Sequence, residues 1–244
     1  MACSLRSVFC ATRAWLALYS LLCIAACERE ARPAAQTLQT RAAAATDPQR
    51  TRPSGTSEAR APLVVFLGDS LAAGLDLPAD QAFPAVLEAS LRASTTPFRL
   101  ANAGVSGDTS AGGLRRLDWL LKQKPKVVVI ELGANDGMRG HPLDALASNL
   151  RAIVARVRAA SAVPLLLGMR VPTSLGAPYS EAFAALYPAL AKELDVAFVP
   201  ELLAGVGGVP ELNLADGIHP TAEGHRRLAD NVRPALIRLL AAAP

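Results

Sequence analysis

Five short apolar segments predict the β-strands of this chain. They are Leu63–Leu67, Phe98–Asn102, Val127–Leu132, Pro164–Met169 and Val196–Val199. Most of their apolar residues follow one another without alternating with polar ones, which is typical of parallel strands buried on both faces. The pattern therefore indicates a sheet in the interior of a folded domain.

Segments with apolar positions at helical spacing lie between these strands and after the last one. They are Gln81–Ala93, Ala111–Lys122, Pro142–Ala160, Glu181–Glu193 and about Thr221–Ala242. Alternating strands and helices predict a parallel sheet with helices on both faces and right-handed crossovers. The expected fold class is α/β, in which residues 62–244 form a single three-layer, flavodoxin-like domain with a doubly wound parallel sheet of about five strands.

The first 26 residues have the pattern of a secretory signal peptide. Met1–Ala14 contain two Arg and no acid, and the apolar segment Trp15–Ala26 follows. As a helix this apolar segment would reach only about 18 Å, short of a hydrocarbon core of about 30 Å. A signal peptide therefore fits better than the alternative, a transmembrane anchor.

The segment ends in Ile24-Ala25-Ala26-Cys27, which resembles the lipobox of bacterial lipoproteins. The resemblance implies cleavage before Cys27, acylation of Cys27 and a membrane partner in the cell envelope, with the protein facing the periplasm. Glu28 follows the cysteine, which favours the outer membrane. The alternative is an ordinary signal peptide and a soluble periplasmic protein. After lipidated Cys27, the remainder of residues 27–61 has no apolar period and is expected to be a disordered linker.

Charge and cysteine content exclude several classes of function for the folded part. Residues 1–61 contain eight Arg and four acidic residues, whereas the rest of the chain contains 17 basic and 17 acidic residues. The net charge of +4 therefore belongs to the N-terminal segment, and we expect no nucleic-acid partner. All four cysteines lie in the first 27 residues, so residues 62–244 cannot form a disulfide scaffold, a thiolate zinc site or a cysteine nucleophile.

Polar clusters follow the predicted strands, where an open parallel sheet binds its ligands. Ser70 comes directly after the first strand, at the expected start of a helix, and is a candidate nucleophile; the alternative is a helix N-cap. Asp216 and His219 precede the last helix at a spacing that lets the carboxylate orient the imidazole. A plain loop-and-cap pair is the alternative there. The other histidines, His141 and His225, are expected to lie on the surface.

Two further residues suit an oxyanion hole beside the N–H of Ser70. Gly107 offers a backbone N–H with no side chain to block approach, and Asn135 offers an amide at the end of the third strand. A turn glycine and an Asx-turn asparagine are the alternatives. All these residues fall at the same predicted edge of the sheet.

Four blocks in this order resemble the SGNH (GDSL-type) hydrolases over about residues 62–240. They are Gly68-Asp69-Ser70-Leu71, Gly107, Gly133-Ala134-Asn135-Asp136 and Asp216-Gly217-Ile218-His219. The resemblance implies a triad of Ser70, His219 and Asp216, with an oxyanion hole formed by Ser70, Gly107 and Asn135. It also implies that residues 137–142 form a mobile loop bordering an acyl pocket. This mechanism requires no metal or cofactor.

The predicted function is that of a serine esterase working through an acyl-enzyme, as a monomer. The expected substrates are small-molecule or lipid acyl esters such as arylesters, acyl thioesters or lysophospholipids. A carbohydrate O-acetyl esterase on the same fold is the nearest alternative. An α/β-hydrolase fits less well because Ala72 stands where the Gly-x-Ser-x-Gly elbow ends in glycine. A non-catalytic flavodoxin-like phosphate-binding module would not need the Asp216–His219 pair, and no phosphate-loop motif follows the first strand.

Overall fold

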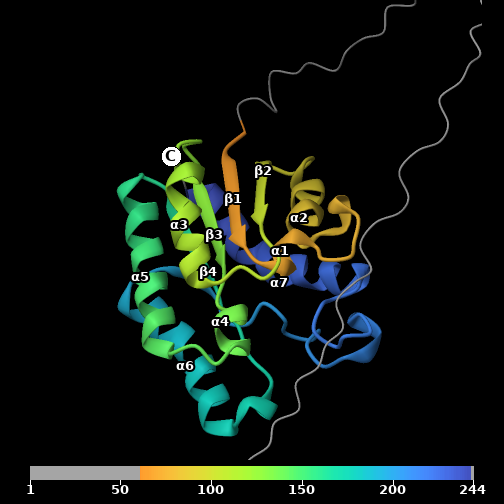
Figure 1. The fold of residues 1–244 in the computed structure, drawn as a ribbon. Coiled ribbons are helices and arrows are strands. Elements are labelled where there is room, and N and C mark those ends of the chain that lie inside the picture. The colour runs from red at the N-terminus through yellow and green to blue at the C-terminus, as the bar shows by residue number, and fades with distance from the viewer. Residues whose placement is uncertain (1–60, 243–244) are drawn as a thin grey trace, which may run out of the picture. The chain divides into compact units, whose positions relative to one another are not determined.

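The computed structural model describes residues 61–242, which are built around a five-stranded parallel sheet. Figure 1 shows this sheet among its helices. The strands are β1 (Leu63–Gly68), β2 (Arg99–Gly104), β3 (Val127–Glu131), β4 (Val163–Leu167) and β5 (Ala197–Val199). Their order in the sheet is β2-β1-β3-β4-β5, and every neighbouring pair is parallel. The predicted α/β class and doubly wound parallel sheet are confirmed.

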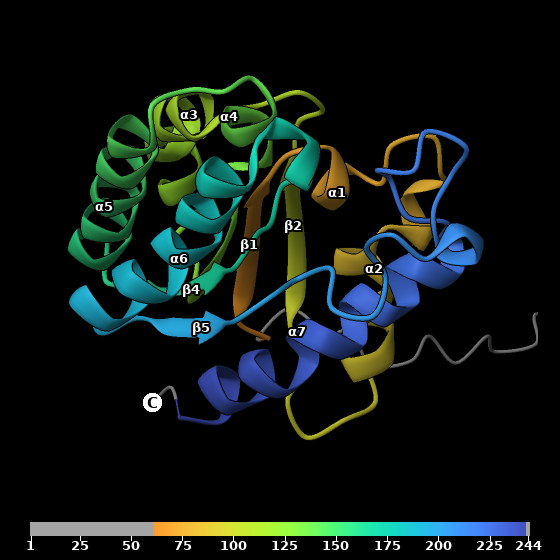
Figure 2. The same cartoon turned by 90° about the horizontal axis from the view of Figure 1, so that it is seen from below.

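Helices cover both faces of this sheet (Figure 2). They are α1 (Ser70–Ala73), α2 (Phe83–Leu91), α3 (Ser110–Leu121), α4 (Ala134–Met138), α5 (Leu143–Ala159), α6 (Ala177–Glu193) and α7 (Ala222–Ala242), with 3₁₀ turns at Ala79–Gln81, Thr173–Leu175 and Pro210–Leu212. Helices α3, α5 and α6 pack on one face, and α2 packs against α7 on the other. The result is three layers, α/β/α.

Element boundaries differ from the sequence prediction in a few places. Helix α6 starts at Ala177 rather than Glu181, because Pro178 occupies its first turn, where a missing N–H costs nothing. Helix α2 is shorter than predicted, since Gln81 belongs to a separate 3₁₀ turn. Helix α4 was not predicted at all. Its five residues include Gly137, and a segment that short shows no helical period.

Pro164 lies inside β4, although proline is normally excluded from the middle of a sheet. The N–H of Val163 donates to the carbonyl of Lys126 on the β3 side. Backbone N–H groups alternate sides along a strand, so Pro164 faces the β5 side. Strand β5 begins to pair only at Leu165 with Ala197, and the missing donor therefore costs no ladder hydrogen bond.

The strand order reverses direction between β1 and β3. Strand β2 lies on one side of β1 in the sheet, and β3, which follows β2 in the chain, lies on the other side of β1. Such a reversal is where doubly wound sheets bind ligands. Ser70 follows β1 at this point, and Asn135 follows β3, so the fold alone brings these two predicted site residues to the same edge.

Candidate active site

The Ser70 hydroxyl is presented by a short helical turn. Ser70 is the first residue of α1, and Asp69 is its N-cap, with Oδ1 accepting a 3.1 Å hydrogen bond from the N–H of Leu71. Gly74 closes the turn in the left-handed region with φ +72°. The alternative that Ser70 is the helix cap is therefore wrong, because Asp69 performs that role and leaves the Ser70 hydroxyl available.

Ser70, His219 and Asp216 form a hydrogen-bonded chain. Ser70 Oγ lies 2.8 Å from His219 Nε2, and His219 Nδ1 lies 2.6 Å from Asp216 Oδ2. Hydrogen bonds from the backbone N–H and the ring of His219 lower the pKa of Asp216 to about 2. An ionised carboxylate can only accept, so Nδ1 carries the ring proton and the Nε2 lone pair faces the Ser70 hydroxyl.

A small hairpin holds His219 in place. Asn213 and Pro220 form an antiparallel bridge, and the N–H of Leu214 donates to the carbonyl of His219 at 2.7 Å. The buried amide of Asn213 donates to two carbonyls of the preceding loop, those of Val206 and Val209, both at 2.7 Å. Backbone hydrogen bonds thus hold the main chain of His219, and Asp216 holds its ring.

Gly107 follows β2 and Asn135 lies in α4 after β3, and both strands neighbour β1, which Ser70 follows. The amide Nδ2 of Asn135 donates to Asp69 Oδ2 at 3.1 Å, which leaves its second N–H for a ligand. Gly107 lies in an exposed turn after β2 with φ +78°, a value that favours glycine. Its carbonyl accepts a 2.9 Å hydrogen bond from Arg139. Their role in an oxyanion hole stays a prediction.

Two buried carboxyl groups beneath the site were missed by the sequence analysis. Glu131, at the end of β3, is fully buried, and its Oε2 accepts the N–H groups of Asp69 and Ala72 at 3.0 and 3.1 Å. Burial raises the pKa of Glu131 well above its usual value, and the charge of Asp69 adds to this. Burial also raises the pKa of Asp69 to about 6. The available signal was a lone acid at the end of an otherwise apolar strand.

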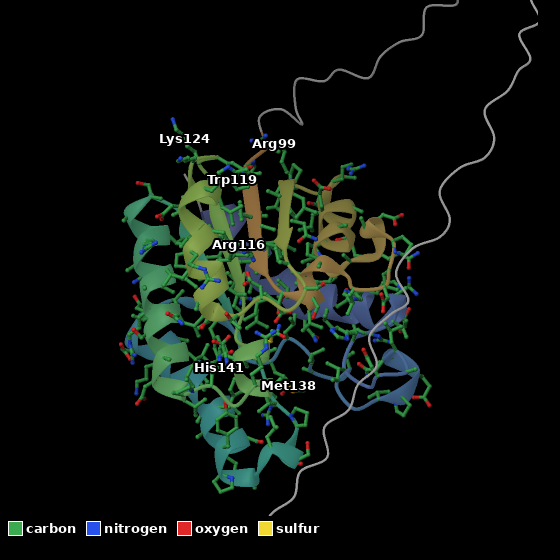
Figure 3. All side chains as sticks on the ribbon, in the orientation of Figure 1. Arg99, Arg116, Trp119, Lys124, Met138 and His141 are labelled. Atoms are coloured by element: carbon green, nitrogen blue, oxygen red, sulfur yellow. The ribbon has the colours of Figure 1, made fainter. Side chains whose placement is uncertain are left out.

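The other two histidines behave differently from each other. His141 is exposed, as expected, just beyond α4 (Figure 3). His225 was expected on the surface, but that prediction is wrong: it is buried, and its Nδ1 accepts the N–H of Phe83 at 3.1 Å. The sequence did not indicate this burial, because the neighbours of His225 are Gly224 and Arg226, which suggest an exposed helix face.

Three other features concern the loop after Asn135, metal ligands and the N-terminal segment. The expected loop 137–142 begins inside α4, which ends at Met138. Within residues 61–242, no three His, Cys, Asp or Glu side chains are grouped so that they could hold a metal ion. The signal segment, Cys27 and the linker up to residue 60 lie outside the described residues.

A serine, an imidazole and a carboxylate in one hydrogen-bonded chain, at the reversal point of a doubly wound parallel sheet, define a hydrolase of the SGNH class. Residues 66–227 match the family described as "GDSL-like Lipase/Acylhydrolase family". The chain belongs to this family and is an ester hydrolase.

Two relatives and one solved structure agree with this assignment. The chain is 45% identical over 186 residues to "Esterase TesA" of Pseudomonas aeruginosa, covering 76% of this chain and 92% of that protein. It is 44% identical over 173 residues to "Thioesterase 1/protease 1/lysophospholipase L1" of Escherichia coli strain K12, covering 70% and 82%. A solved structure of TesA superposes with a TM-score of 0.70 at 46% identity, covering 72% of this chain and 98% of that one.

Proposed function

We propose that Ser70 is the nucleophile of this hydrolase, His219 its general base and acid, and Asp216 the group that orients His219. One observation carries the assignment: the Ser70 Oγ–His219 Nε2 hydrogen bond of 2.8 Å continues into the His219 Nδ1–Asp216 Oδ2 hydrogen bond of 2.6 Å. A serine hydroxyl is a weak nucleophile unless an adjacent base removes its proton.

The first half of the reaction forms an acyl-enzyme. Ser70 Oγ bonds to the ester carbonyl carbon while His219 Nε2 takes the hydroxyl proton. The carbonyl oxygen becomes an oxyanion, held by the N–H groups of Ser70 and Gly107 and by the side-chain amide of Asn135. The carbon–leaving-group bond then breaks, and His219 gives its proton to the departing alcohol or thiol.

The second half releases the acid. Water attacks the acyl carbon as His219 Nε2 takes one of its protons, and the same three donors hold the second oxyanion. The ester bond to Ser70 Oγ breaks, and the proton returns from His219 to that oxygen. Asp216 remains ionised throughout and stabilises the imidazolium that forms twice per turnover.

We propose arylesters, acyl thioesters or lysophospholipids as the substrates. Support comes from the names of the relatives, which include esterase, thioesterase and lysophospholipase. Exposed apolar side chains near the ends of the strands also fit an acyl chain: Val105 follows β2, Met138 ends α4 and Ile218 precedes His219.

The test is hydrolysis of p-nitrophenyl esters from acetate to palmitate by the full-length chain, beside Ser70→Ala. The matched control is Ser90→Ala, which removes a serine hydroxyl bonded only to the Leu87 carbonyl on α2. Ser70→Ala should lose about 10⁴-fold or more in kcat, and Ser90→Ala should match the parent. Turnover by Ser70→Ala within tenfold of the parent would refute the mechanism. Activity confined to acetate would favour the carbohydrate O-acetyl esterase, which acetylated sugars would then test.

We also propose that Cys27 carries a lipid anchor that holds the enzyme at the periplasmic side of a membrane. The support is the sequence Ile24-Ala25-Ala26-Cys27 after a basic and apolar segment. Among the helices of residues 61–242, none is both long and apolar enough to span a bilayer.

A further inference from the structure

Arg116, on α3, binds two strand ends and one loop at the edge of the site (Figure 3). Its Nη2 donates to the Gly68 carbonyl at 2.9 Å, and its Nη1 to the Ala103 carbonyl at 2.6 Å. Its Nε donates to Asp108 Oδ2 at 2.7 Å. The guanidinium therefore uses all three of its nitrogens to join the ends of β1 and β2 to the segment that follows β2.

The turn that contains Gly107 is held at both of its ends. Its first residue, Val105, donates its N–H to the Gly68 carbonyl at 3.0 Å. Its last residue, Asp108, donates its N–H to the Val105 carbonyl at 3.0 Å, and its side chain binds Arg116. With φ +78° at the third position, Gly107 has the conformation of a type II turn.

Both ends of the turn are thus connected by hydrogen bonds to the same atom, the Gly68 carbonyl oxygen. One end reaches it through the Val105 N–H, and the other reaches it through Asp108 and Arg116. Gly68 stands two residues before Ser70 in the chain. The guanidinium therefore sets the position of the exposed Gly107 turn relative to the residue that carries the nucleophile.

We propose that Arg116 is a positioning residue of the oxyanion hole, which acts through Asp108 to hold the Gly107 N–H in register with Ser70. The proposal rests on the proposed function above. Asp108 and Arg116 have side chains only 11% and 24% exposed, so their pairing is poorly screened by solvent. The planar fork of arginine can donate in three directions at once, which the ammonium of lysine cannot reproduce in the same geometry.

The expected effect is on turnover rather than on substrate binding. A donor that meets the oxygen only when it becomes an oxyanion contributes to the transition state and not to the ground state. Misplacement of a catalytic group by about 1 Å can cost about 10²-fold in rate. Arg116→Gln should therefore lower kcat about 10- to 100-fold and leave KM within about twofold of the parent.

The experiment compares Arg116→Gln, Arg116→Lys and Asp108→Asn in the full-length chain with p-nitrophenyl butyrate as substrate. Kinetics are measured per folded molecule, after Tm and circular dichroism have been recorded. The control is Arg151→Gln, which breaks another arginine–carboxylate pair, the two hydrogen bonds to Glu193 between α5 and α6. Ser70→Ala in the same series reports on the proposed function itself.

The proposal expects Arg116→Gln and Asp108→Asn to lower kcat without raising KM, and Arg116→Lys to recover only part of the loss. The double variant should lose no more than the worse single variant, since both act through one turn. Folded Arg116 and Asp108 variants with kcat within threefold of the parent would overturn the proposal. A failure of all three variants to fold would also overturn the proposal, because the Arg116–Asp108 pair would then be needed for folding and not for positioning the Gly107 turn. Activity retained in Ser70→Ala would instead refute the proposed function.

Discussion

Acid should destabilise this protein through His225, whose ring lies between α7 and α2. Its Nδ1 accepts the N–H of Phe83 at 3.1 Å, and its ring stacks at 6.4 Å on the Phe83 ring. Burial lowers the pKa of His225 from 6.5 to about 4, with a smaller contribution from the charge of His219. A protonated Nδ1 would point its own hydrogen at the Phe83 N–H, so the folded state requires the neutral ring.

The sign and size of the effect follow from proton linkage. Between pH 6.5 and about 4 the unfolded chain binds a proton at His225 that the folded chain does not. The free energy of unfolding therefore falls as the pH falls through this window and levels off below about pH 4. At about 1.4 kcal/mol per pH unit, the full loss from this group is about 3 kcal/mol.

Two carboxyl groups act in the opposite sense and must be separated from His225. Asp69 and Glu131 have raised pKa values, so the folded state holds their protons more tightly and gains stability as the pH falls. Subtracting a His225→Gln variant removes their contribution, because both proteins keep them. Glutamine also offers an oxygen that can accept the Phe83 N–H.

The assay is urea unfolding of the parent and of His225→Gln between pH 3.5 and 8. The stability advantage of the parent should shrink by about 3 kcal/mol from pH 7 to pH 4. A difference between parent and His225→Gln that stays constant within about 0.5 kcal/mol across this range would refute the reasoning.

Three other changes test the site and its support. Asp216→Asn should keep the fold, because this side chain lies at the surface and is 43% exposed, but it should lower kcat about 10⁴-fold by disturbing the imidazole tautomer. Steady-state kinetics that show a loss below tenfold would contradict this. Gly104→Ala would place a methyl group 2.7 Å from the Ala72 carbonyl carbon and against the Ala73 nitrogen, so it should cost about 1–3 kcal/mol; an unchanged Tm would show that α1 can move aside. Cys27→Ser should shift the enzyme from the membrane fraction to the soluble fraction, and unchanged fractionation would refute lipid anchoring.

The fold could be predicted where one physical signal dominates a segment. Val127–Leu132 is apolar except for Glu131, and all five residues of β3 are buried, so the sequence alone indicated a strand buried on both faces. The signal failed where another constraint acts. Helix α4 is five residues long and follows Gly133, which has φ +117°. A turn of that length is set by its tertiary contacts and leaves no period in the sequence.

Candidates for the reacting groups could be chosen from the sequence because their chemistry limits the choice. The described part of the chain contains three histidines, and only one of them has an aspartate three residues earlier. The supporting groups could not be predicted in this way. Arg116 and Gly68 are 48 residues apart, and Glu131 and Asp69 are 62 apart, so their contacts depend on strand register and helix placement. From sequence alone, an arginine on an amphipathic helix indicates only a solvated face.

The two halves of the site are built into different parts of the fold. Ser70 follows a central strand, and the carboxyl groups of Asp69 and Glu131 beneath it are 1% and 0% exposed. Asp216 belongs to a surface hairpin, and its side chain is 43% exposed. Substitutions beneath Ser70 should therefore change stability and turnover together, since they leave buried polar groups unpaired. Substitution of Asp216 removes contacts at the surface and should change turnover much more than stability. A plot of Tm against kcat for variants of both halves separates them if this account of the site is correct.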